Sequence, residues 1–401
     1  MKAPRKFLVV LAVIGLLAAG WAIIARPAAF YPEPSPTATP WPIPRRVDSP
    51  DYGVNLHIWW DPWAAVRREW PLVAEGGFTW VKQRLAWQDV EGAGPGAYEW
   101  AAADRIVAEA EQAEVNLIFR VDHPPAWAAP DPDAEATEAS PPVDVAAFGD
   151  FCHTLAERFR GRVAGYQVWN EPNLAREWGG QTPDPLGYTQ LLRACYIGVK
   201  RADPEALVIS AGLSPTGSGP PHALPDADFL RGMYAAGAAP YFDLLGLNAP
   251  GYKAPPEIAP EEAADPANDY GGHRVFCFRH VENMRAVMIE HGDVHKQVAI
   301  LEFGWHTAAS PDHPDYAWFA VTPEQQAAYL VRAFDYAREH WSPWIGPMFV
   351  WNLPDSHWTP ADEEFWWAIA DPFWWGFDGD FESWEGADVR PAFEALQEME
   401  K

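Results

Sequence analysis

Short apolar runs alternate with stretches of helical periodicity along most of the chain. Helical spacing is clearest in Ala101–Ala113, Val145–Arg160, Tyr188–Arg201, Val281–Glu290 and Pro323–His340, and Pro391–Met399 would close the chain as a last helix. The apolar runs are typical of buried strands. Eight of them are present: Tyr52–His57, Thr79–Leu85, Asn116–Val121, Val163–Trp169, Ala206–Ala211, Leu244–Asn248, Gln297–Leu301 and Met348–Trp351.

This alternation predicts an α/β fold with a parallel sheet, because strand-helix-strand units join parallel strands. Eight such units in about 350 residues favour a (β/α)₈ or TIM barrel over residues 51–401. A doubly wound open sheet is the alternative. It would usually carry a glycine-rich phosphate turn after its first strand, and no such turn follows Tyr52–His57.

Long segments rich in Trp, Pro, Asp and His follow several of the predicted strands. In a barrel these segments meet at the carboxyl-terminal face, where barrel active sites lie. Long loops at that face would build walls around a cleft. The segments are Pro124–Pro142, Ser214–Asp228, Ala249–His280, Trp305–Thr322 and Asn352–Val389.

The amino terminus has the pattern of a membrane-targeting segment. Basic residues precede an uncharged run of about 19 residues within 1–26, which is long enough either for a signal anchor or for a cleaved signal peptide. Residues 27–50 are rich in proline and predict an extended linker. The following domain is therefore expected outside the cytoplasm, anchored to the cell membrane or secreted.

The amino-acid composition argues against some classes of binding partner. The chain has 401 residues, of which 29 are basic and 56 acidic, for a net charge of −27. This charge argues against nucleic acid or an anionic membrane surface as a partner, and it makes a neutral glycan a better ligand than a polyanionic one. The 23 tryptophans fit either sugar-binding surfaces or an aromatic core.

Three cysteines, Cys152, Cys195 and Cys277, are too few for a disulfide scaffold and lack the spacing of a metal site. One disulfide with one free thiol is possible from the sequence, and three buried thiols is the interpretation it favours.

Two motifs place a glutamate at the end of an apolar strand. The run Tyr166–Asn173 reads YQVWNEPN and delivers Glu171, while Val298–Trp305 reads VAILEFGW and delivers Glu302. Glycoside hydrolysis needs two carboxyl groups, one to protonate the leaving oxygen and one to attack or to position water. Two like charges held close together also raise one pKa, so that one carboxyl group stays protonated.

These motifs resemble the acid/base and nucleophile motifs of clan A glycoside hydrolases, which are retaining (β/α)₈ enzymes. Further likeness to families 5 and 39 lies in FTWVKQRLAW, residues 78–87, and in PPAW, residues 124–127. The resemblance implies that Glu171 is the general acid/base and Glu302 the nucleophile. It also implies that Asn170 binds the sugar 2-hydroxyl, that Tyr252 hydrogen-bonds the nucleophile, and that Trp351 lies beneath the sugar.

The chain departs from the clan pattern at two places. Lys82, with Arg84 two residues further on, stands where the clan has an arginine, and the two cations differ in hydrogen-bonding geometry. Asn248 stands where many relatives have histidine. With these residues, His123 after the third strand and Trp305 at the end of the second motif complete the predicted substrate-binding set.

The sequence thus predicts an exported retaining glycosidase that cleaves β-glycosidic bonds, with no cofactor and no metal. Two alternatives remain: a surface carbohydrate-binding barrel that has lost catalysis, and a transglycosidase that passes the glycosyl unit to another sugar.

Overall fold

The computed structural model describes residues 47–60, 65–130, 139–308, 314–372 and 389–401. The predicted membrane segment and nearly all of the proline-rich linker lie outside these ranges. Within them, no helix combines the length and the apolar character that crossing a membrane requires.

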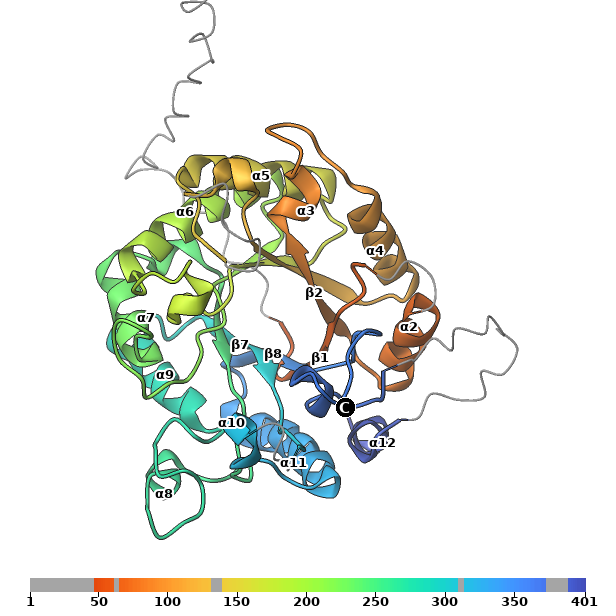
Figure 1. Ribbon diagram of the computed structural model, residues 1–401, viewed down its shortest axis with the longest axis vertical. Helices are drawn as coiled ribbons and strands as arrows, with labels where there is room; N and C mark the ends of the chain where they lie inside the picture. The colour runs from red at the N-terminus through yellow and green to blue at the C-terminus, as the bar shows by residue number, and fades with distance from the viewer. Residues whose placement is uncertain (1–46, 61–64, 131–138, 309–313, 373–388) are drawn as a thin grey trace, which may run out of the picture. The chain divides into compact units, whose positions relative to one another are not determined.

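Eight parallel strands close into a barrel in which each strand pairs with its neighbours in sequence and β8 pairs with β1 (Figure 1). The strands are β1 Asp51–Leu56, β2 Trp80–Ala86, β3 Asn116–Asp122, β4 Gly165–Val168, β5 Leu207–Ile209, β6 Leu244–Asn248, β7 Gln297–Phe303 and β8 Ile345–Val350. The predicted (β/α)₈ barrel is therefore confirmed, and the open sheet is excluded.

The longer helices form a ring around the strands in chain order (Figure 1). The α-helices are α2 Ala65–Glu75, α3 Trp87–Glu91, α4 Ala101–Gln112, α5 Val145–Arg158, α6 Pro185–Ala202, α7 Asp226–Ala235, α8 Pro260–Ala263, α9 His280–Glu290, α10 Pro314–Ala317, α11 Pro323–Tyr336 and α12 Pro391–Glu398. Short turns of other helix types are η1 Ala126–Ala128, η2 Ala175–Glu177, η3 Ala239–Tyr241, η4 Ala337–Trp341 and η5 Glu364–Trp366.

The clearest helices begin at side chains that cap them. Asp184 accepts a hydrogen bond from the backbone of Leu186 and is followed by Pro185, which suits the first helical position of α6. Thr322 forms a capping box with Gln325 at the start of α11. Local sequence therefore fixes where these helices start.

All eight predicted strands are present, with ends that differ by up to three residues. Five of the α-helices were not predicted, and three of them, α3, α8 and α10, are only four or five residues long. The interior proline Pro71 obscures the periodicity of α2, and α7 begins at Asp226, within the segment expected to be a loop. The predicted helix 323–340 ends as α11 at Tyr336 and continues as the π-helical turn η4.

The barrel interior is apolar away from the carboxyl ends of the strands. A separate cluster of buried residues comes from six of the strands, and its members are Trp80, Ile118, Leu207, Ile209, Leu244, Ala299, Leu301 and Phe349. Because side chains alternate along a strand, Lys82 and Arg84 share the inward face of Trp80, and Arg120 and Asp122 share that of Ile118. The interior thus changes from apolar to charged toward the carboxyl ends of the strands.

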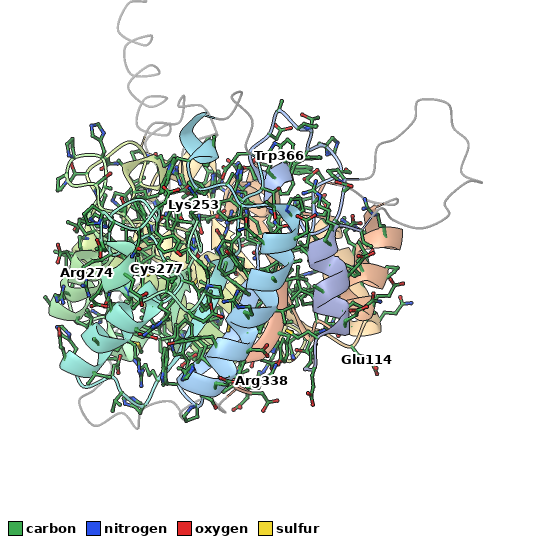
Figure 2. All side chains as sticks on the ribbon, turned by 90° about the horizontal axis from the view of Figure 1, so that it is seen from below. Glu114, Lys253, Arg274, Cys277, Arg338 and Trp366 are labelled. Carbon is green, nitrogen blue, oxygen red and sulfur yellow. A yellow bond between two sulfur atoms is a disulfide. The ribbon has the colours of Figure 1, made fainter. Side chains whose placement is uncertain are left out.

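The two ends of the barrel are distinct in side view. Figure 2 places Lys253 and Trp366, which lie in segments that follow strands, at one end. Glu114 and Arg338, which lie in segments that precede strands, are at the other end. The predicted long loops therefore gather at the carboxyl-terminal face.

The prediction of three thiols is wrong. Cys152 of α5 and Cys195 of α6 form a disulfide, and Cys277 is free and buried. The two helices are adjacent in the outer ring, and both cysteines lie on their buried faces. Sequence spacing alone could not reveal this, because the sequence separation of 43 residues spans β4 and long connections.

Candidate active site

Glu171 and Glu302 lie together at the carboxyl-terminal end of the barrel. The amide nitrogen of Asn248, the last residue of β6, donates to both carboxyl groups, at 3.0 Å to Glu171 Oε1 and 3.2 Å to Glu302 Oε2. The two oxygen atoms therefore cannot lie more than 6.2 Å apart, the sum of these distances. A single side chain thus holds the two predicted catalytic groups at a fixed spacing.

Glu171 is presented by a turn with unusual backbone geometry. Both Trp169 and Glu171 have positive φ, at 73° and 38°. Residues other than glycine adopt such angles only where the surroundings impose them. Here the Trp169 ring is fully buried and its indole N–H donates to the carbonyl of Glu177. The backbone N–H of Glu171 donates to Gly212 after β5.

Glu302 faces into the barrel because β7 is irregular. Its neighbour Leu301 belongs to the apolar interior cluster, so strict alternation would turn Glu302 outward. The register shifts between Ile300 and Phe303 in the pairing with β8, and again beside Asn248 in the pairing with β6. Such irregularities re-aim side chains next to active sites.

Two cations approach the Glu302 carboxyl group. Lys82 donates to Oε1 at 3.0 Å, and an Arg120 nitrogen lies 3.6 Å from the same oxygen. Arg84 instead pairs with Asp122, so Lys82 is the residue of β2 that contacts the predicted nucleophile. Burial lowers the pKa of Lys82 to about 8, a shift that the charge of Glu302 opposes.

Asp122, at the end of β3, organises the cations of the site. It lies 3.0 Å from Arg84, 2.9 Å from Arg120 and 2.8 Å from His123. Burial alone would raise the pKa of its carboxyl group, but these positive neighbours outweigh burial and hold it far below its usual range. His123 is thus a partner of Asp122 at the site, and its positive φ of 48° turns the chain there.

The second oxygen of Glu171 has a different neighbour. Arg176, in η2, donates to Oε2 at 3.1 Å and also lies 3.9 Å from Glu177. Burial and the charge of Glu171 raise the pKa of Glu177 to about 7. Neither of these residues, nor Arg120 or Asp122, belongs to the set predicted from the sequence.

An aromatic group borders the site on the side of β1 and β8. The His57 ring lies 5.2 Å from that of Trp351 and 4.6 Å from that of Trp358, between centroids. Burial, followed by the charges of Arg120, Lys82 and Arg84, lowers the pKa of His57 to about 3, so its imidazole is neutral. Trp351 is partly exposed, and the peptide bond that follows it is cis.

Two predicted contacts differ from the structure. The Tyr252 hydroxyl donates to the carbonyl of Pro215 at 3.1 Å and not to Glu302. Trp305 is completely buried, and its indole donates to the carbonyl of Ala254. It therefore supports the loop after β6 and has no exposed surface for a substrate.

Two carboxamide oxygens at the site are buried without a hydrogen-bond partner. Among the described residues, Oδ1 of Asn170 and Oδ1 of Asn248 have no hydrogen-bond partner. Leaving such atoms unpaired costs about 1–3 kcal/mol each, so polar groups of a substrate that reach them gain binding energy. In the same part of the chain no cluster of three or more acidic, histidine or cysteine side chains is arranged to hold a metal ion.

No family model matches the chain, and no curated protein sequence is significantly similar to it. Solved structures are similar in fold. A family 39 glycoside hydrolase from the gut symbiont Bacteroides cellulosilyticus WH2 is 21% identical, with a TM-score of 0.60 over 88% of this chain and 64% of that one. The chain therefore spans slightly less than two thirds of that protein.

Two further structures cover 88% of this chain. The GH5_18 protein from Streptomyces cattleya, solved in complex with GlcNAc, is 16% identical with a TM-score of 0.58 over 80% of its length. A GH39 β-xylosidase from Caulobacter crescentus is 14% identical with a TM-score of 0.55 over 72% of its length. The chain thus shares the barrel fold of glycoside hydrolases of families 5 and 39, the families that its sequence motifs resemble.

Proposed function

We propose that the protein is a retaining glycoside hydrolase that cleaves β-glycosidic bonds of an oligo- or polysaccharide. The observation that carries this proposal is the link through Asn248, which keeps an oxygen of Glu171 within 6.2 Å of one of Glu302. Retaining enzymes hold their two carboxyl groups about 5–5.5 Å apart, whereas inverting enzymes need about 6.5–9.5 Å to admit water between them.

In the first step, the Glu302 carboxylate attacks the anomeric carbon as the bond to the leaving oxygen breaks. Glu171 gives its proton to that oxygen, so the leaving sugar departs as an alcohol. In the second step, Glu171 takes a proton from water, and the water oxygen displaces Glu302 with restored configuration. Lys82 and Asn248 position the nucleophile through both transfers.

The surrounding side chains support a sugar ring in the cleaved position. Trp351 offers a partly exposed apolar face for the C–H face of a pyranose, beside the neutral His57. The buried Oδ1 of Asn170 is an acceptor for a sugar hydroxyl. The clan resemblance implies a β-linked substrate, and one structural neighbour is named a β-xylosidase.

A transglycosidase would use the same first step and pass the glycosyl unit to a second sugar. The charged contacts around both carboxyl groups argue against a barrel that has lost catalysis, because an inactive site has no need to position Glu302 beside Lys82 and Arg120.

The place of action that we propose is outside the cytoplasm. The amino-terminal pattern of residues 1–26 supports export, as an anchor or as a cleaved signal. The Cys152–Cys195 disulfide is in keeping with an oxidising compartment.

The proposal is tested by sugar release from neutral β-glucans, xylans, mannans, galactans and aryl β-glycosides. The purified full-length protein should release sugar from at least one, and proton NMR should detect the retained anomer first. Glu302→Ala should release none. Release of the inverted anomer would contradict the mechanism, and transfer products at high acceptor concentration would favour the transglycosidase.

Azide separates the two carboxyl roles. Added to Glu302→Ala, azide should enter from the face that Glu302 occupied and give the inverted glycosyl azide. Added to Glu171→Ala, it should attack the glycosyl-enzyme and give the retained azide. The opposite pairing would exchange the roles of the two residues.

A further inference from the structure

The two oxygens of Glu171 face different surroundings. Oε1 accepts from Asn248, on the side of Glu302. Oε2 accepts from Arg176, which belongs to the short turn η2 in the segment after β4. If Glu171 is the acid, the oxygen that is free of Asn248 is the one that carries the proton toward the leaving group. The residues around Oε2 therefore border the leaving half of the substrate.

Arg176 is unusually open for a residue that contacts a catalytic group. Its side chain is 70% exposed, while that of Glu171 is 11% exposed. Burial raises the pKa of Tyr252, and of Tyr316 to about 12, and the charge of Arg176 opposes the increase at both hydroxyls. Hydrogen bonds link the same groups: Asn173, three residues before Arg176, exchanges hydrogen bonds with Ser214, and the Tyr252 hydroxyl donates to the neighbouring Pro215. Tyr252 of the loop after β6 and Tyr316 of α10 thus lie near Arg176.

A partly exposed tryptophan adjoins these tyrosines. Trp318 is 40% exposed, and its ring is nearly parallel to that of Tyr252, at 20° and 6.1 Å between centroids. Phe276 packs against it at 5.1 Å. Gly271 has a φ of +86°, and a Cβ there would come within 2.5 Å of the Trp318 ring, so the glycine lets the loop close against its edge. Trp318 is held in place and still presents apolar surface.

We propose that Arg176, Tyr252 and Trp318 form a leaving-group subsite that takes a pyranose ring of the departing glycan. The flat apolar surface of Trp318 suits the C–H face of such a ring, and Arg176 has N–H donors for its hydroxyls. As the ring binds, Arg176 turns from Glu171 to these hydroxyls, and Oε2 is left to hold the proton. This inference rests on the proposed function and adds to it the residues that bind the sugar ring on the leaving side.

The test compares two substrates that share one glycone, chosen as the sugar released in the panel experiment. One is the oligosaccharide, and the other is the β-glycosyl fluoride, whose leaving ion has no ring to bind. In the full-length protein, Trp318→Ala should lower kcat/KM for the oligosaccharide by about tenfold or more and that for the fluoride by less than about twofold. Arg176→Gln should likewise lower kcat/KM for the oligosaccharide more than that for the fluoride.

The control is Trp344→Ala, which removes a partly exposed tryptophan just before β8, at the opposite end of the barrel. It should change neither substrate by more than about twofold. An equal loss on both substrates in Trp318→Ala would show a structural role, and no loss on either would show that no ring binds there. Both outcomes overturn the inference and leave the proposed function standing.

If the wild type cleaves neither substrate, the proposed function fails by itself. The subsite is then tested by calorimetric binding of cello-, xylo- and manno-oligosaccharides to the wild type and to Trp318→Ala. Binding weakened about tenfold would support a ring-binding surface. Unchanged binding, or no binding to either protein, would overturn the inference.

Discussion

The two carboxyl groups of the site occupy contrasting surroundings. Glu302 lies among side chains of the barrel strands, with Lys82 from β2, Arg120 from β3 and Asn248 from β6 all largely buried. Glu171 shares Asn248, but its other partner is the exposed Arg176 on a short turn. One group is held by rigid elements and the other by an adjustable one. This suits a nucleophile that stays in place and an acid/base that changes its protonation twice.

The largest expected effect is that of removing Glu302, the carboxyl group held by the barrel strands. Glu302→Ala should lower kcat on a β-glycosyl fluoride by about 10⁴-fold or more, because the attacking carboxylate is gone. Steady-state fluoride release measures this loss. Glu111→Gln, on the outer face of α4, is the matched control and should keep wild-type activity. Activity within about tenfold of wild type in Glu302→Ala would remove Glu302 from the mechanism.

The effect of removing Glu171 should depend on the leaving group of the substrate. Glu171→Ala should lower kcat/KM for an oligosaccharide by about 10²–10⁴-fold, because the departing alkoxide needs a proton. The same substitution should lower kcat/KM for the fluoride far less, since the fluoride ion leaves without a proton. Parallel assays on both substrates decide this. Equal losses would mean that Glu171 does not act as the acid.

Lys82, which contacts Glu302, should itself titrate. Lys82 has a pKa of about 8, so it is charged below that pH and neutral above it. As the pH rises through 8 the ion pair with Glu302 is lost, and activity on the fluoride should fall. Lys82→Met should reduce kcat by about 10–100-fold at pH 7. Lys82→Arg keeps its charge, so its alkaline limb should move to higher pH, and an unchanged limb would exclude Lys82 as its origin.

The strands explain how far the sequence alone could lead. Glu171 and Glu302 are predicted because each ends an apolar strand, and Lys82 because it stands where the resembled clan has an arginine. The sequence also carries a signal for Arg120 and Asp122, which the predicted set does not include. They are charged residues at alternate positions of a strand that is otherwise apolar after Asn116. Alternation puts both on the inward face of β3, beside Ile118.

Beyond the strand ends this periodicity no longer applies. Tyr252 has a positive φ of 52°, and Trp305 comes two residues after β7 ends, so neither direction follows from alternation. The resemblance implies a nucleophile contact for Tyr252, and Trp305 belongs to the predicted substrate-binding set, but the structure shows a backbone partner for each. Arg176 lies in a turn whose shape depends on the buried Trp169, which contacts the same turn through Glu177. Tertiary packing sets these positions.

The smallest expected effect concerns the exposed partner of Glu171. Arg176 contacts the oxygen of Glu171 on the leaving-group side, so Arg176→Gln should lower kcat/KM for the oligosaccharide by about two- to tenfold. The fluoride, which has no ring to bind and needs little acid assistance, should change by less than about twofold.

The ratio of the two kcat/KM values is the readout here, because a loss of correctly folded protein lowers both values alike. Arg162→Gln, which removes an exposed arginine paired with Glu111 on the outside of the barrel, should leave this ratio unchanged. An unchanged ratio in Arg176→Gln would mean that Arg176 does not act on the leaving side of Glu171. The contrast between the two carboxyl groups would then be one of position alone.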